Sequence, residues 1–457
     1  MALIRYPETV DPRLTPPWER LMPIVNETTA IAIDRATESS AGGFPIRRIL
    51  WCLVPATTAA FAMFNGVAQI LIPAQVEHID PAGKVANLAL LASSATVTSL
   101  IGLMVGGALS DRTYGRWGRR TPWLVLSAVA AAILLLVLGT RTSLPGVAIV
   151  YLLLWLAANI YLGALTPVMV DRIPENRWGM ASAVVGLGVP LGVLIGVNGV
   201  ARVSRETGYV LLAVFLLATT ALLVTCARES SSVRSRTAPG LLPNTGLLRD
   251  TAPGTLWARS TASLASFRSA DFTHAFLGRA LILLSFNMLV SFQYYLLQDY
   301  IGVGNLPQHS PAVALSILTM FQTAGWISAT AAAGWLAARL DRNKLFVGIC
   351  SVGVAVAMGV PMLSPTWPGM ILFQTLFGIF FGTYYSVDLA LISQVLPHRE
   401  SAGRDMGIMN MAHLSQLVAP GIAGALILRF GYQALFTLCM IAAVGGAVLV
   451  FRIRSVR

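Results

Sequence analysis

One acidic residue, Asp388, lies well inside a long apolar stretch of this chain of 457 residues. Pro397 follows nine positions later, and a helix rising 1.5 Å per residue would place Asp388 roughly 13 Å from the helix end. An ionised carboxylate at that depth in a bilayer costs at least about 2.5 kcal/mol unless it is paired or hydrated. A carboxylate that gains and loses a proton as water reaches it would couple solute movement to a proton gradient. The alternative is a structural partner for a buried polar cluster.

Charge is concentrated in residues 106–123 (GGALSDRTYGRWGRRTPW), where one Asp and four Arg fall within ten positions. Ion pairs at helix ends can form in one state of a moving bundle and break in another. We expect Asp111 to cap a helix amino terminus in the other half of the chain, and Arg112 or Arg116 to pair with Asp171 or Glu175. The alternative is that these arginines only fix orientation in a membrane. The candidate cytoplasmic gate consists of Asp111, Arg112, Arg116, Arg119, Arg120, Asp171, Glu175, Arg177, Arg404 and Asp405.

Amide, aromatic and imidazole groups recur on several apolar stretches. Such groups hold hydroxylated ligands, although hydrogen bonds between helices explain any one of them nearly as well. Arg279 lies near a helix end and is expected to extend to the surface, so no deep cation is expected to hold an anion. The set therefore predicts a neutral polar ligand. The candidate binding residues are Asn65, Gln69, Trp155, Asn159, Asn287, Gln293, Tyr294, Gln298, Asn410, His413 and Gln416.

The elements that must position these residues are apolar helices. The chain is 56% hydrophobic and 11% charged, whereas a soluble protein carries about 25% charged residues. This composition excludes soluble enzymes, nucleic-acid-binding proteins and disordered chains, and no alternating pattern of a membrane β-barrel is present. Twelve uncharged stretches of about 20 residues predict an all-α integral membrane protein with twelve transmembrane helices. They cover residues 49–76, 85–110, 122–140, 146–170, 179–200, 208–227, 280–298, 311–338, 345–363, 368–396, 406–428 and 432–451.

Two longer polar segments divide the spans six and six. Residues 1–48 form a Pro-rich tail, 228–273 a basic linker and 453–457 a short carboxyl terminus, which leaves six-helix bundles at 49–227 and 274–452. Placing the amino terminus inside puts 27 of the 32 basic residues on the cytoplasmic face. Both termini are therefore expected in the cytoplasm. The net charge of +12 is explained by this topology and by contact with anionic lipid, rather than by binding to nucleic acid.

The two bundles also repeat a charged turn. In each turn a Pro closes one helix, charged residues follow, and an Arg and a Gly stand at the start of the next helix. The two turns are residues 170–179 (VDRIPENRWG) and 394–407 (QVLPHRESAGRDMG). Repeats of six helices form central sites that open alternately to each side of a membrane. The sequence thus predicts two pseudo-symmetric bundles.

The charged loop at 106–123 resembles the signature of the major facilitator superfamily. Its longer form, residues 110–113 and 116–123, is similar to that of the glycoside–pentoside–hexuronide cation symporters and sucrose-type transporters. Residues 271–279, 297–300 and 387–397 also resemble bacterial members of that branch. The resemblance covers all twelve spans and implies the major facilitator fold. The second-half signature differs, because Ala338 stands where an acid is expected and Asp341 comes three positions later.

The expected function is secondary active transport by alternating access, importing a neutral polar solute such as a sugar or glycoside with protons or Na⁺. The alternative is a proton-coupled efflux antiporter for a metabolite or drug, because residues 186–192 (GLGVPLG) partly resemble a helix-5 signature of drug antiporters. The sequence has no nucleophile–base, nucleotide or metal motif, so we expect no enzyme activity and no cofactor except the coupling ion. We expect a multi-pass protein of the cell (inner) membrane that works as a monomer, with the solute and lipid as partners and no nucleic acid.

Overall fold

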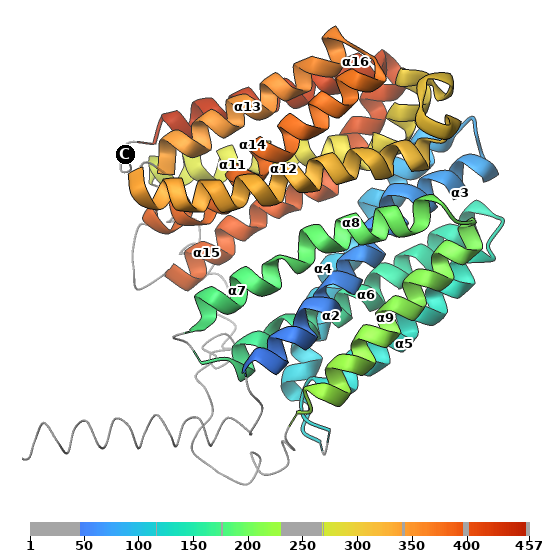
Figure 1. Ribbon diagram of the computed structural model, residues 1–457, viewed down its shortest axis with the longest axis vertical. Helices are drawn as coiled ribbons and strands as arrows, with labels where there is room; N and C mark the ends of the chain where they lie inside the picture. The colour runs from blue at the N-terminus through green and yellow to red at the C-terminus, as the bar shows by residue number, and fades with distance from the viewer. Residues whose placement is uncertain are drawn as a thin grey trace, which may run out of the picture.

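The computed structural model describes residues 46–115, 117–174, 177–229, 267, 269–340, 343–395 and 402–453, and each element in these ranges is helical (Figure 1). The expected amino-terminal tail, most of the linker and the last four residues lie outside them. We refer to residues 46–229 as the first half and to residues 267–453 as the second half.

Six spans make up the first half, and the structure interrupts two of them. A π-helical segment lies within the first span, and the fifth span is two helices where the sequence predicted one. The α7 helix ends at Gly186, four residues before Pro190, whose missing N–H cannot bond to that carbonyl. The elements are α2 (Ile46–Gly66), η1 (Val67–Leu71), α3 (Ile72–Ile79), α4 (Lys84–Arg112), α5 (Thr121–Gly139), α6 (Leu144–Arg172), α7 (Trp178–Gly186), α8 (Gly188–Ala201) and α9 (Arg205–Cys226).

The second half follows the same plan, with a π-helical segment again in its first span. Its elements are α11 (Ala270–Tyr295), η5 (Leu296–Gly302), η6 (Val303–Asn305), η7 (Pro307–His309), α12 (Pro311–Leu340), α13 (Asn343–Leu363), α14 (Trp367–Val395), α15 (Ala402–Asn410), η9 (Met411–Leu414) and α16 (Ser415–Phe451).

Eleven described helices are long and apolar enough to cross a membrane, and the last of these contains two spans. It covers 45 residues, Gly407–Phe451, and would be about 67 Å long as one helix, against a hydrocarbon core of about 30 Å. Gly431 breaks it with φ 78° and ψ −177°, a conformation that glycine adopts without strain. The break falls between the two spans that the sequence predicted there.

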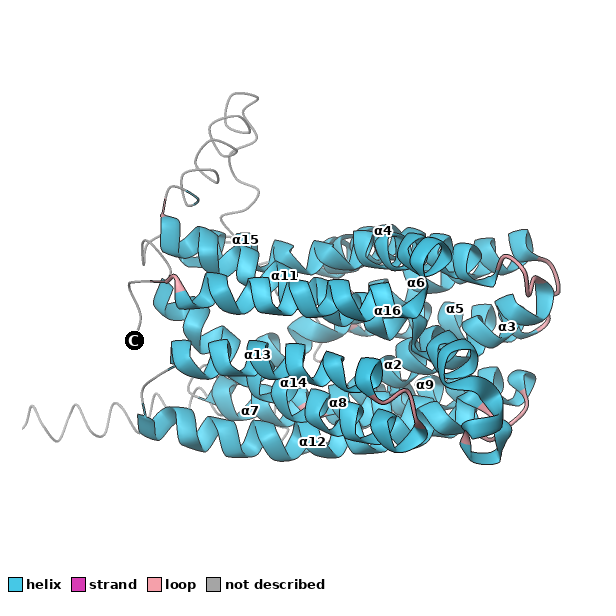
Figure 2. Cartoon of the chain, turned by 90° about the horizontal axis from the view of Figure 1, so that it is seen from above, coloured by secondary structure: helices cyan, strands magenta, loops and turns pink. Residues whose placement is uncertain are grey.

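Helix pairing repeats between the halves. In the first half α4 and α5 both pack on α6, and α5 also packs on α9. In the second half α12 and α13 both pack on α14, and α13 also packs on α16. The halves meet along two equivalent seams, α4 with α16 and α8 with α12. Figure 1 shows the halves side by side, and in Figure 2 their helices run roughly parallel.

Glycines allow the closest helix pairs. A Cβ at Gly106 would lie 2.7 Å from the Cα of Ile160, and one at Gly196 would lie 2.6 Å from the Cα of Ala62. Both distances are shorter than real Cβ contacts, so α4 meets α6 and α8 meets α2 backbone to backbone. Glycines recur every four residues in both helices, and this spacing puts them on one packing face. They are Gly102 and Gly106 in α4, and Gly188, Gly192 and Gly196 in α8.

Candidate functional site

The charged residues at one end of the first half converge on Arg120. We call this end, which holds residues 110–120, the signature end. The Arg120 side chain is buried and forms ion pairs of 2.7 Å with Asp111 and 2.9 Å with Asp171, and it donates to Ser110 Oγ. Arg119 adds a second ion pair to Asp111 at 3.1 Å. One buried guanidinium therefore joins the end of α4 to the end of α6.

The described residues give Asp111 other partners than the expected one. It pairs with Arg119 and Arg120 of its own half, and no bond from it to a helix of the second half is seen within the described ranges. Asp171 pairs with Arg120, which was not among its expected partners Arg112 and Arg116, and Arg112 is exposed. The expected pairs that involve Arg116 or Glu175 fall outside the described residues. The remaining predicted residues are Arg177, which is exposed, Asp405, which is buried on α15, and Arg116, Glu175 and the Arg404 side chain, which lie outside the description.

Glu229, which lies just after α9, also contacts this network and was not predicted from the sequence. Its carboxylate accepts from the backbone N–H of Arg120 at 2.9 Å and from that of Thr121 at 3.1 Å, at the first turn of α5. A carboxylate in this position satisfies free N–H groups and complements the helix dipole. The only sequence signal was an acid directly after a span.

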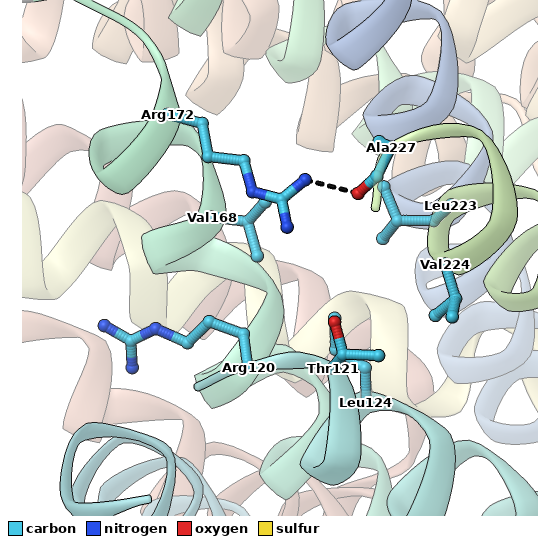
Figure 3. A pocket seen from close by; sticks show the side chains of 8 residues that line it. All are labelled: Arg120, Thr121, Leu124, Val168, Arg172, Leu223, Val224 and Ala227. Carbon is cyan, nitrogen blue, oxygen red and sulfur yellow. Dashed lines mark hydrogen bonds between the residues drawn. The ribbon is translucent and has the colours of Figure 1, made fainter. Parts of the chain in front are cut away.

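A small pocket with a cavity volume of about 10 Å³ lies beside this network (Figure 3). Arg172 points into it and donates to the backbone oxygen of Ala227. The pocket lies among α5, α6 and α9, within the first half, so it is not a site between the halves. Its lining residues are Arg120, Thr121, Leu124, Val168, Arg172, Leu223, Val224 and Ala227.

The second half contains a buried pair of opposite charges. Arg279 Nη1 lies 3.2 Å from Asp388 Oδ2, and the two side chains are only 9% and 11% exposed. Arg279 Nη2 lies 3.2 Å from His413 Nε2, so α11, α14 and η9 meet at this point. The Tyr384 hydroxyl, one turn before Asp388 on α14, lies beside the carboxylate. Arg279 thus contacts both the predicted coupling acid and a predicted binding residue.

The expectation for Arg279 was wrong. It lies nine residues into α11, about 14 Å from the helix start, and its side chain is buried instead of reaching the surface. The pull of Asp388 explains the difference, because burying either charge alone costs more than burying the pair. A neutral ligand was expected because no deep cation was expected, and the buried Arg279 removes that reason.

Four of the eleven predicted binding residues, all Asn or Gln, form hydrogen bonds within their own helical spans. Gln69 donates to Asn65 at 2.8 Å, and Asn159 and Asn287 donate to backbone oxygens one turn earlier. Trp155 is buried and packs edge-on against Phe64, with ring centroids 5.5 Å apart. Gln293 and Tyr294 are buried on α11, and Asn410 and Gln416 are exposed. Of the described members of this set, His413 contacts the buried charge pair.

A second charged network lies at the other end of the molecule, which we call the opposite end. Lys84 bonds to Glu77 at 3.1 Å within the first half and to Asp299 at 2.8 Å in the second half. The predicted binding residue Gln298 lies here and donates to Glu77. Tyr295 donates to the backbone oxygen of Pro73 at 2.9 Å. These bonds cross between the halves, so the structure is closed at the opposite end.

Two six-helix halves, sealed to each other at one end and holding buried charges, have the architecture of a membrane transporter. The chain matches the sequence profile of the Major Facilitator Superfamily over residues 53–306 and 275–457. It therefore belongs to this superfamily and is a multi-pass membrane transporter rather than an enzyme.

Three known proteins show how far this likeness extends. The chain is 25% identical over 171 residues to "MFS transporter asaE" of Aspergillus flavus, covering 37% of this chain and 39% of that protein. The crystal structure of a D-xylose-proton symporter superposes with a TM-score of 0.66 at 14% identity, over 90% of this chain and 98% of that one. A mutant of the nucleoside transporter NupG gives 0.65 at 13% identity, over 89% and 98%. At these identities the two structures show a shared fold.

Proposed function

We propose that this chain is a proton-coupled importer of a small hydroxylated solute, with Asp388 as the group that carries the coupling proton. The buried ion pair of Asp388 and Arg279 carries this proposal. In the closed pair the carboxylate is ionised and held by Arg279. Protonation of Asp388 would cancel one of two charges and release the guanidinium, so the proton changes the contacts among α11, α14 and η9.

We propose that the signature end and both termini lie in the cytoplasm, and the excess of basic residues supports this orientation. The opposite end, where Lys84 joins the halves, then faces outward, and the structure corresponds to a state closed to the outside. In such a state the coupling proton exchanges with the cytoplasm. The halves rock about the two seams, and the two charged networks form and break in alternation.

A sugar or related solute is the first substrate class to test. The sequence resembles the glycoside–pentoside–hexuronide and sucrose-type branch, and the superposed structures are described as a D-xylose-proton symporter and a nucleoside transporter. Amide and phenol groups on α2, α6 and α11 suit hydroxyl groups. We propose that one chain suffices for transport, since it contains both halves.

Uptake into cells tests the proposal. Labelled glucose, xylose, sucrose and gluconate are offered to cells expressing the wild type, Asp388→Asn, or the control Glu206→Gln, a change at an exposed acid on α9. We expect at least one solute to accumulate in the wild type and the control, and accumulation to fall at least tenfold with Asp388→Asn or a protonophore.

Two results would contradict the proposal in different ways. Protonophore-sensitive uptake that survives Asp388→Asn would assign the coupling proton to another group. Absence of uptake of every solute, with the protein present in the membrane, would exclude import and favour proton-coupled efflux. Gly192 belongs to the segment of α8 that resembles drug antiporters. It closely approaches Phe61 and Ala62 of α2.

A further inference from the structure

The Arg279 guanidinium has more hydrogen-bond donors than the described protein satisfies. Its residue is 8% exposed, yet Nε and Nη1 have no hydrogen-bond acceptor among the described residues. Asp388 lies within ion-pair distance of Nη1, and His413 contacts Nη2. An arginine carries five N–H donors, and buried donors of a charged group are normally satisfied because leaving them unpaired is costly. The buried Tyr384 hydroxyl beside Asp388 also has no hydrogen bond of good geometry to the described residues.

Free donors on a buried cation call for an oxygen-rich anion. A carboxylate suits a guanidinium best, because both groups are planar and charge-assisted hydrogen bonds are about twice as strong as neutral ones. Asp388 supplies a carboxylate at Arg279, 3.2 Å from Nη1. A second carboxylate next to it would be repelled while Asp388 is ionised, and would be attracted once Asp388 is protonated.

We infer that Arg279 binds a carboxylate group of the transported solute in exchange for Asp388, so that the substrate is a small organic acid. This inference rests on the proposed proton coupling and names the substrate class. The proton goes from water to Asp388, Asp388 releases Arg279, and the solute carboxylate replaces it. One anion and one proton then move together, so the transport step carries no net charge.

The charged and titratable groups around the exchange come from four elements. Arg279 lies on α11, His413 on η9, and Tyr384 and Asp388 on α14, while Asp405 is buried on α15, which packs against α14. Asp388 is the carboxylate that lies 3.2 Å from the Arg279 guanidinium. Its proton is therefore the one that should be linked to anion binding.

The smallest carboxylate gives a direct test of binding. In the purified full-length protein, Asp388→Ala removes the internal carboxylate and leaves space beside Arg279. We expect formate to raise the Tm of this variant, whereas the neutral analogue formamide does not. When Arg279→Gln is added to Asp388→Ala, the Tm response to formate should be abolished. Adding Arg429→Gln, the same change at an exposed arginine, should leave that response unchanged. If Asp388→Ala or Arg279→Gln does not fold, Asp388→Asn and the double variant Arg279→Gln/Asp388→Asn replace them.

Vesicle transport gives the second test, with gluconate and sorbitol as a matched acid and alcohol. We expect a pH gradient to drive gluconate uptake and a membrane potential alone to leave it unchanged, because the anion and the proton cancel. Apparent affinity of the wild type for gluconate should fall about tenfold per pH unit above the protonation range of Asp388, and Asp388→Asn should remove this dependence.

The outcomes separate the two ideas. Equal stabilisation by formate and formamide, or a formate response that survives loss of Arg279, overturns the carboxylate site. Sorbitol uptake driven by both the pH gradient and the potential overturns it too, while leaving proton-coupled import intact. Proton-independent uptake of either solute would instead remove the proposed function on which the inference rests.

Discussion

Arg279 and Asp388 hold opposite charges inside a helical bundle, where either charge alone would be costly. Their side chains are about nine-tenths buried and 3.2 Å apart. The ion pair does not imply high stability, because desolvation offsets much of the attraction. Its value to the protein lies in its response to a proton, which changes the charge of one partner and leaves the other unpaired.

At the residue scale, we expect Arg279→Gln alone to destabilise the protein by about 3–5 kcal/mol, because an ionised Asp388 would remain buried without its partner. The double variant Arg279→Gln/Asp388→Asn should recover most of this loss, since both buried charges are then removed. Thermal unfolding in detergent measures both effects. If the two single losses simply added in the double variant, the residues would not act as a pair.

At the scale of elements, the glycine faces decide how closely the helices approach. Gly106 on α4 lies against the backbone of α6, whereas its neighbour Gly107 has no atom within 4 Å of the position a Cβ would take. The two positions share a helix and a residue type but differ in surroundings. Substituting alanine at each position therefore separates the effect of helix propensity on stability from the effect of packing.

We therefore expect Gly106→Ala to lower stability by about 1–3 kcal/mol, because the added methyl group meets the backbone at Ile160, which cannot move as a side chain would. Gly107→Ala should be neutral or raise stability by up to about 1 kcal/mol, as alanine favours a helix over glycine. Tm values of the two variants check this. Equal effects at both positions would show that close α4–α6 contact does not limit stability.

At the scale of the whole molecule, bonds that cross between the halves decide which end is closed. Lys84 is 14% exposed, bonds to Asp299 across the interface, and its ammonium lies 4.9 Å above the Tyr295 ring. Tyr432 donates to the other oxygen of Asp299 at 3.0 Å and so holds this acceptor in place. The bonds of Arg120 described above stay within one half and do not oppose separation at the signature end.

We expect Lys84→Gln to favour states open at the opposite end by about 1 kcal/mol, or about fivefold in the ratio of states. Spin labels at Thr142 and Leu363, exposed residues of the two halves at this end, would report longer distances. Arg429→Gln, which removes an exposed charge at the same end, is the matched control. Unchanged distances in Lys84→Gln would mean that apolar contacts along the seams hold the closed state.

One part of the candidate site, Asp388, could be predicted because its residue type and position in an apolar span are informative by themselves. Asp388 was identified since an acid inside an apolar span is costly and therefore needs a reason to be there. Arg279 was misjudged because distance from a helix end does not show which partner a long side chain will find. The Lys84–Asp299 bond joins residues 215 positions apart, and no local pattern relates them.

The sequence by itself determined the helical class, the spans, the two halves and the glycine faces. These features follow from backbone hydrogen bonding in lipid and from residue size, which act locally along the chain. The tertiary structure decided which arginine pairs with Asp171, that Arg279 is buried beside Asp388 and His413, and which end is closed. Those outcomes depend on the distances and surroundings of charges on different helices, which are set only when the helices pack.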